Sequence, residues 1–180
     1  MTSPSDRTIQ ATNDDATSSK AHAVKRGYWK DAYMHYFCPI PVHKSPEINR
    51  GYFVRTQAFK AITLSFIKST NGNCQIVNLG AGSDTLYFQL RDSGTVPRKF
   101  VEVDLEHNVH RKISIIRRHK LLGDIGQRSD EVMQDCLRYS QDGDVNLLPV
   151  GRLTDLDYVD GKVLLFDTCT NNVRRYFAFC

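Results

Sequence analysis

The sequence contains no run of apolar side chains long enough to cross a membrane. A membrane-spanning helix needs about 20 consecutive apolar residues, and no segment of this chain approaches that length. Residues 1–20 are rich in Ser, Thr, Asp and Asn and lack the apolar segment that marks a secretory signal. We therefore expect a disordered polar tail over residues 1–20 and no membrane association.

Paired cysteines are missing as well. The five cysteines are odd in number and scattered, and no two of them form a C-x-x-C motif. A small protein held together by disulfides would show an even number of cysteines at regular spacings. The pattern favours reduced thiols in a cytosolic or nuclear protein, and we expect a cytoplasmic location.

Aromatic residues are absent from the most basic part of the chain, which contributes to the net charge of +4. This cluster consists of Arg111, Lys112, Arg117, Arg118, His119 and Lys120. Without a ring to stack on a base, it is more typical of a solvated helix end than of a nucleic-acid interface. A metal site is equally incomplete, because His107 and His110 lack a clear third ligand nearby. We expect neither nucleic acid nor metal as a partner.

The chain does contain a glycine turn between two apolar runs. The first run, residues 75–79, ends in Gly80-Ala81-Gly82, and the second, residues 99–104, ends in Asp104. This order is typical of the first half of a nucleotide-binding βαβ unit. Glycine lets the backbone approach a ligand, and the Asp104 carboxylate can accept hydrogen bonds from both ribose hydroxyls. Glu102, on the same strand face, is expected to be a polar edge residue.

The turn lacks the features of two common phosphate-binding loops. A dinucleotide fingerprint needs a third glycine where this chain has Thr85, and a P-loop needs a Lys-Ser/Thr pair that does not follow here. A nucleoside without phosphates fits better, and S-adenosylmethionine is the common one. The turn by itself leaves a nicotinamide cofactor or a ligand-free α/β turn as alternatives.

A long helix is predicted ahead of this unit. Ser45-Pro46-Glu47 is a typical helix start, and the helix should run to about Ser69. Its apolar stripe consists of Ile48, Tyr52, Phe59, Ile62 and Phe66, with Arg55 on the same line. The Arg55 guanidinium either extends to solvent over apolar surface or faces a ligand pocket and pairs with a carboxylate. The aromatic segment 28–37 is expected to form a small lid.

The remaining patterns predict an incomplete sheet. Helices are expected from a cap at Ser83 or Asp84 to a point before Gly94, over residues 106–118, and as a candidate over residues 129–137. Two further apolar runs, at residues 145–150 and 162–167, raise the number of expected strands to about four. In the usual order the fourth lies beside the first, which leaves a central edge unpaired. We therefore expect a truncated product, with residues 171–180 as an atypical tail that has no place to pack.

Four segments together resemble the leucine carboxyl methyltransferases, which methylate the C-terminal carboxylate of the protein phosphatase 2A catalytic subunit. They are residues 27–33, 45–55, 75–85 and 101–104, and the most specific strings are E-I-N-R-G-Y-F-x-R and Q-I-V-N-L-G-A-G-x-D-T. The similarity runs from about Lys20 to Leu156. It implies an α/β, Rossmann-like S-adenosylmethionine-dependent methyltransferase fold, with a helical lid and cofactor-contacting helix over residues 21–72 and a partial methyltransferase domain over residues 73–170.

The resemblance also implies S-adenosylmethionine contacts at six positions, namely Lys20, Arg55, Gly80, Asp104, Asp155 and Leu156. Arg55 would hold the methionine carboxylate, Gly80 would lie under the ligand, and Asp104 would bind the ribose. Asp155 and Leu156 would border the adenine.

The implied reaction needs no catalytic side chain, because a C-terminal carboxylate is already ionised at neutral pH and requires no general base. The expected product is a leucine methyl ester, the expected partner is the phosphatase catalytic subunit, and we expect a monomer. Two alternatives remain at this point: an inactive truncated form that acts as a binding module, and a nicotinamide-dependent oxidoreductase.

Overall fold

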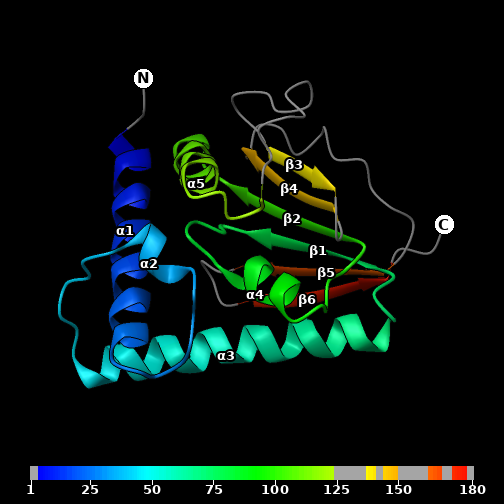
Figure 1. Cartoon of the computed structure of the whole chain (residues 1–180), viewed down its shortest axis with the longest axis horizontal. Helices are drawn as coiled ribbons and strands as arrows, with labels where there is room; N and C mark the ends of the chain where they lie inside the picture. Colours follow the sequence, from blue (N-terminus) through cyan, green and yellow to red (C-terminus); the bar gives the residue numbers. More distant parts are fainter. Residues whose placement is uncertain (1–3, 124–136, 141–143, 150–161, 168–171, 178–180) are drawn as a thin grey trace.

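A central sheet with helices around it makes up the part of the chain that the computed structural model describes, residues 4–123, 137–140, 144–149, 162–167 and 172–177 (Figure 1). The helices are α1 (Pro4–Lys25), α2 (Met34–Phe37), α3 (Pro46–Ser69), α4 (Leu86–Asp92) and α5 (Glu106–Arg118). The strands are β1 (Cys74–Leu79), β2 (Lys99–Asp104), β3 (Leu137–Ser140), β4 (Asp144–Pro149), β5 (Lys162–Asp167) and β6 (Asn172–Phe177). Every helix in these ranges is too short or too polar to cross a membrane.

The strand order in the sheet is β3-β4-β2-β1-β5-β6. The central strands β4, β2, β1 and β5 run parallel, and β3 and β6 are antiparallel at the two edges. β1 is buried over nearly its whole length, including the polar Gln75 and Asn78, because a central parallel strand is covered on both faces. The four expected strands are present as β1, β2, β4 and β5.

The chain reverses direction across the sheet beside β1. It passes from β1 to β2 and then to β4 on one side, and it returns to place β5 on the other side of β1. The carboxyl ends of β1 and β2 point towards α1 (Figure 1). Ligands of open parallel sheets bind outside the carboxyl ends of the strands, at such a reversal.

The edge of β5 is not left unpaired as expected. β6 pairs with it in antiparallel register from Lys162 with Phe177 to Asp167 with Asn172. The expected tail over residues 171–180 therefore supplies a strand, because its backbone completes the hydrogen bonding of β5. β3 was also not expected; it begins at Leu137, and the rest of the helix candidate over residues 129–137 lies outside the described residues.

The expected disordered tail over residues 1–20 is wrong for most of its length, because α1 is helical from Pro4. The helix packs against α2 and α3. Its buried side chains are small or weakly polar, namely Thr17, Ser19, Ala21, His22 and Ala23. Such residues let two helices approach closely, and they give no strong apolar stripe that would reveal the helix in the sequence.

Helix α3 begins and ends where predicted, with Ser45 at the N-cap and the positive φ angles of Asn71 and Gly72 after its last turn. Its apolar stripe is only partly buried. Phe66 is in the core, whereas Ile48 is 45% exposed, and α3 also packs against α1. In that contact the buried His22 ring lies 3.0 Å from the Asn49 Oδ1 atom.

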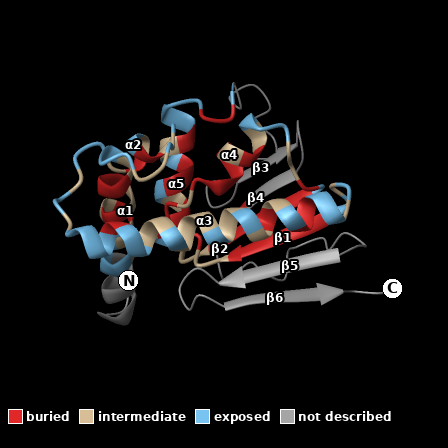
Figure 2. Ribbon diagram, turned by 90° about the horizontal axis from the view of Figure 1, so that it is seen from below, coloured by how far each residue is buried: buried red, intermediate tan, exposed pale blue. Residues whose placement is uncertain are grey.

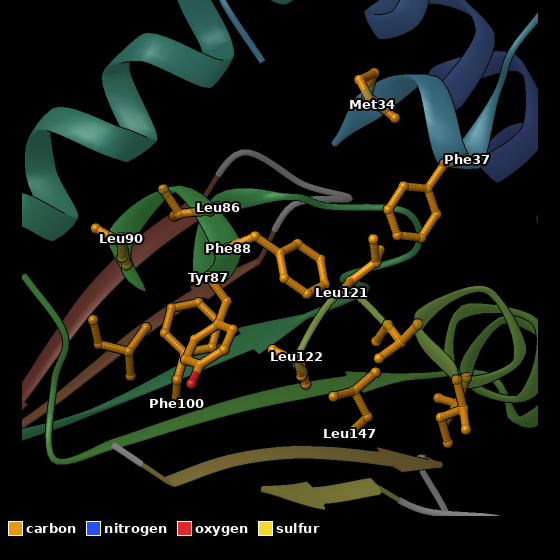
Figure 3. Close-up of a cluster of buried hydrophobic side chains, with 14 of the residues drawn as sticks. Met34, Phe37, Leu86, Tyr87, Phe88, Leu90, Phe100, Leu121, Leu122 and Leu147 are labelled. Atoms are coloured by element: carbon orange, nitrogen blue, oxygen red, sulfur yellow. The ribbon is translucent and has the colours of Figure 1, made fainter. Parts of the chain in front are cut away.

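One hydrophobic cluster joins α2, α4, α5 and the central strands (Figure 3). Phe88 of α4 lies at its centre, with its ring 4.9 Å from that of Tyr33 and 6.4 Å from that of Phe37. The expected aromatic lid is therefore partly core, since Met34 and Phe37 are buried. Buried residues concentrate on β1, β2, α4 and one side of α5, while α3 has an exposed outer side (Figure 2).

The packing of α1 predicts that Ala23→Leu destabilises the protein, because Ala23 is fully buried. Overpacking of this kind lowers the free energy of unfolding by about 1–3 kcal/mol, as chemical denaturation would measure. Ala11→Leu is the matched control, since Ala11 is exposed on the same helix, and it should change stability by less than about 0.5 kcal/mol. Equal effects of the two substitutions would contradict the packing of α1.

Candidate functional site

A cavity of about 370 Å³ lies beside the glycine turn, between α1, α3, α4 and the carboxyl end of β2. Four of the residues expected to contact a cofactor line it: Lys20, Arg55, Gly80 and Asp104. They come from separate elements, so the fold brings them together. The other two expected contacts, Asp155 and Leu156, lie outside the described residues.

The glycine turn is held against the end of β2. The backbone N–H groups of Gly80 and Ala81 both donate to the Val103 carbonyl, at 2.8 and 3.2 Å. Gly80 and Gly82 have φ angles of +65° and +48°, a region that favours glycine. The two glycines are therefore required by the backbone path of the turn as well as by space for a ligand.

Asp104 ties the turn to the start of α5. Its Oδ2 atom accepts a hydrogen bond from the Gly82 N–H at 2.6 Å, and its Oδ1 atom accepts from the Leu105 N–H at 2.6 Å and the Asn108 amide at 2.7 Å. A carboxylate has about four lone-pair sites. The three donors fix the orientation of the carboxylate and leave capacity for a ligand hydroxyl.

Helix α1 presents one face to the cavity. Asn13, Ala16 and Lys20 follow helical spacing and all line it. The Asn13 side chain covers the turn so closely that a Cβ atom at Gly82 would lie 2.1 Å from its Oδ1 atom. The Asn13 amide also approaches the Asn108 Oδ1 atom at 3.5 Å. The start of the chain thus forms a wall of the cavity directly above the turn.

Two basic side chains, Lys20 and Arg55, line this part of the cavity. Burial lowers the pKa of the Lys20 amine below its ordinary value, and the Asp84 carboxylate opposes this effect. The nearby Lys112 and Arg55 side chains lower the pKa of Lys20 further. Arg55 lines the cavity as predicted, and it forms no ion pair with a carboxylate of the described residues. Both positive groups face a space that an anion could fill.

A hydrogen-bonded chain of side chains makes up the opposite wall. The Asp31 Oδ2 atom accepts from the Thr85 hydroxyl at 2.6 Å and from the Gln89 amide at 3.0 Å, and the Gln89 Oε1 atom accepts from the Lys60 amine at 2.9 Å. The second Asp31 oxygen accepts the backbone N–H groups of Tyr33 and Met34 at the start of α2. This network joins α2, α3 and α4 around the cavity.

The helix cap before α4 differs from the prediction. The N-cap residue is Thr85 rather than Ser83 or Asp84, although the Asp84 Oδ1 atom accepts a hydrogen bond from the Leu86 N–H at 2.6 Å. Asp84 precedes the N-cap residue by one position, and its side chain still satisfies a backbone N–H group in the first turn of α4.

Two charged residues that were expected at the surface form a buried ion pair. The Lys112 Nζ atom lies 2.6 Å from the Glu102 Oε2 atom, and each side chain is 4% exposed. Glu102 is therefore not a polar edge residue, and Lys112 does not belong to the solvated basic cluster. Burial raises the pKa of the Glu102 carboxyl, and Lys112 opposes that shift.

Several cavity residues were not found by sequence reasoning. Asn13, Asp31, Gln89 and Asn108 line the cavity beside the expected contacts. Asn13 was missed because residues 1–20 have no apolar pattern that would indicate a helix. The other positions carry no signal in the sequence, because their roles arise from elements that meet only in the fold.

The fold and cavity define an α/β protein with a candidate ligand site at the carboxyl ends of its strands, and comparison with known proteins identifies its family. Residues 8–136 match the model of the leucine carboxyl methyltransferase family. The chain therefore belongs to that family.

Curated relatives agree with this assignment. The chain is 48% identical over 117 residues to the leucine carboxyl methyltransferase 1 homolog of Arabidopsis thaliana, covering 64% of this chain and 35% of the relative. It is 41% identical over 122 residues to leucine carboxyl methyltransferase 1 of Bos taurus, covering 67% and 37%. It is also 39% identical over 103 residues to the tRNA wybutosine-synthesizing protein 4 of Rattus norvegicus, covering 54% and 15%. The chain thus spans little more than a third of the methyltransferases it matches.

The surroundings of Lys20 predict a distinctive pH dependence of its chemical labelling. Only the unprotonated amine is acylated, and the pKa of Lys20 in the folded chain lies below the ordinary value of 10.5. Mass spectrometry should therefore show that the ratio of Lys20 labelling in the folded chain to that in the urea-unfolded chain rises as the pH is lowered from 10 to 7. Limited access of the reagent to the Lys20 amine lowers this ratio by the same factor at every pH, so it cannot produce the expected rise. A ratio that stays flat would contradict the assigned surroundings.

Proposed function

We propose that the cavity binds S-adenosylmethionine and that the protein transfers its methyl group to the C-terminal leucine carboxylate of the protein phosphatase 2A catalytic subunit. The observation that carries the proposal is the convergence of Lys20, Arg55, Gly80 and Asp104 on one cavity beside the glycine turn. The family membership supports the type of reaction. Because the chain spans only 35% and 37% of two of its relatives, the activity of this chain is part of the proposal.

The residues present suit the chemistry of this cofactor. Asp104 is oriented by three donors and keeps acceptor capacity for a ribose hydroxyl. Arg55 and Lys20 supply positive charge for the methionine carboxylate, and a guanidinium binds a carboxylate through two parallel hydrogen bonds. Gly80 belongs to the turn and lines the cavity, and its lack of a side chain leaves room for the ligand. Asp155 and Leu156 stay a prediction for the adenine end.

The fold suits the same proposal. The reversal of the chain beside β1 is the place where Rossmann-like sheets bind nucleosides, and we assign this chain to that group of folds. The lid role extends to the segment around Trp29, which lines the cavity, and to the cavity face of α1. These parts would cover a bound ligand and exclude water.

The proposed reaction requires no proton transfer by a side chain of the protein. When bound, S-adenosylmethionine supplies a methyl group on a positively charged sulfur. The acceptor carboxylate is ionised at neutral pH, so no side chain has to remove a proton from it. The protein's residues orient the two reactants and exclude water around charges that neutralise each other during the transfer. We assign no residue as a general base.

The protein partner, the cellular location and the oligomeric state are part of the same proposal. We take the phosphatase catalytic subunit as the protein partner, the cytoplasm as the location and the monomer as the working state. A binding module without methyltransferase activity is the second candidate. The two candidates differ in whether the chain binds the cofactor.

Isothermal titration with S-adenosylhomocysteine tests the cofactor site. The wild-type chain should show saturable binding, and Arg55→Met should weaken it by roughly tenfold to a hundredfold, because a charge-assisted contact is lost. Arg50→Met is the matched control, since Arg50 is exposed on the same helix, and it should bind like the wild type. A folded wild-type chain that does not bind would overturn the cofactor site and leave the binding module.

Transfer of the methyl group is tested with a peptide acceptor. The chain should move a radiolabelled methyl group from S-adenosylmethionine to a peptide that ends in a free leucine carboxylate, and mild base should release the label as expected for an ester. A peptide with an amidated C-terminus should stay unlabelled. Label that resists base, or equal labelling of both peptides, would contradict carboxylate methylation.

A further inference from the structure

The buried Lys112 side chain contacts the cavity turn from below. Besides its ion pair with Glu102, the Lys112 Nζ atom donates a hydrogen bond to the Asp84 carbonyl oxygen at 2.6 Å. Asp84 lies between the glycines and α4, and it lines the cavity. Lys112 thus joins α5 and β2 to the turn on the side away from the ligand space.

The environment of Lys112 holds its amine in one place. The amine lies 6.0 Å from the centre of the Phe37 ring and 5.9 Å from that of Phe88. These two rings face each other in the core (Figure 3). A positive charge in such surroundings is stable only with partners, and it has two: the Glu102 carboxylate and the Asp84 carbonyl. Both contacts measure 2.6 Å, so a shift of the turn would lengthen at least one of them.

The turn has few other anchors at this end. Gly80, Ala81 and Gly82 are held by β2 and Asp104, as described above. Beyond them, the Asp84 N–H donates back to the Ala81 carbonyl at 2.9 Å, within the turn itself. The Thr85 hydroxyl reaches Asp31, which belongs to the segment before α2. Among the described residues, Lys112 is the link from the Asp84 carbonyl to the sheet side of the fold.

We infer that Lys112 is a positioning residue, which fixes the turn through the Asp84 carbonyl so that Gly80, Asp84 and Asp104 keep the arrangement that binds the cofactor. This inference rests on the proposed function for its link to the cofactor. Glu102 has a different role, since its Oε2 atom balances the charge of Lys112, and among the described residues its carboxylate makes no hydrogen bond to the turn. Loss of the ion pair and loss of the turn contact are therefore separable.

Three variants separate the two roles. Lys112→Met removes both the charge and the donor to Asp84, whereas Glu102→Gln keeps Lys112 and offers it an uncharged acceptor. The double variant Glu102→Leu with Lys112→Met removes both buried charges and restores apolar packing, which often recovers stability. Each variant is compared with the wild type in thermal melting, in S-adenosylhomocysteine titration and in amide hydrogen exchange without ligand.

The inference predicts a split between stability and cofactor affinity. Both single variants should melt at lower temperature, but only Lys112→Met should bind S-adenosylhomocysteine about tenfold or more weakly, because a small displacement of a binding group has an effect of that size. The double variant should recover melting temperature without recovering affinity. Recovery of affinity together with stability would overturn the inference and leave the ion pair a purely structural contact.

Hydrogen exchange tests the same inference without any cofactor. In both variants that lack Lys112, the Asp84 and Leu86 amides should exchange at least about tenfold faster relative to the Ile76 and Val77 amides of β1, since local opening exposes only the turn. A uniform change at all four amides would overturn the inference. If the wild-type chain does not bind S-adenosylhomocysteine, the proposed function fails, and this exchange ratio still decides whether Lys112 positions the turn.

Discussion

The hydrogen bond between the Gly82 N–H and the Asp104 carboxylate is the contact on which the site depends. It joins the turn after β1 to the end of β2, and the same carboxylate holds the first residues of α5. The φ angle of Gly82 favours glycine, and a Cβ atom at this position would clash with the Asn13 side chain. The shape of the cavity floor follows from these two residues.

The walls of the cavity depend on charges and small side chains placed by other elements. Helix α1 approaches the turn because its inward residues are small, which brings Asn13 and Lys20 above it. The Asp31 network closes the opposite side, and Lys112 holds the turn from below. Ligand groups would thus meet polar atoms that are already fixed by bonds within the protein, an arrangement that favours tight binding of a charged cofactor.

The sequence predicted the parts of the fold that have local patterns. The strands β1 and β2, the glycine turn between them and the start of α3 at Ser45-Pro46 are of this kind, and the structure confirms them. α1 and β6 were missed because neither has an apolar pattern: α1 is stable through contacts of small residues with α3, and β6 through backbone pairing with β5. Lys112 and Glu102 were misplaced because a charge in a sequence usually indicates the surface, and only the fold brings the two opposite charges together in the core. Of the four expected site residues that meet in the cavity, Gly80 and Asp104 belong to the strand, glycine turn and acid of one local motif, whereas Lys20 and Arg55 come from α1 and α3 and were expected only from the resemblance.

The most direct test of the account is a two-dimensional NMR titration of the unlabelled ligand S-adenosylhomocysteine into the isotope-labelled chain. The account predicts that the amides of Gly80, Gly82 and Leu105 shift together with those of Asn13 and Lys20 on α1, with one common saturation curve, while the exposed outer side of α3 stays unchanged. Absence of shifts, or shifts that leave out either the turn or α1, would contradict the claim that these elements form one cofactor site.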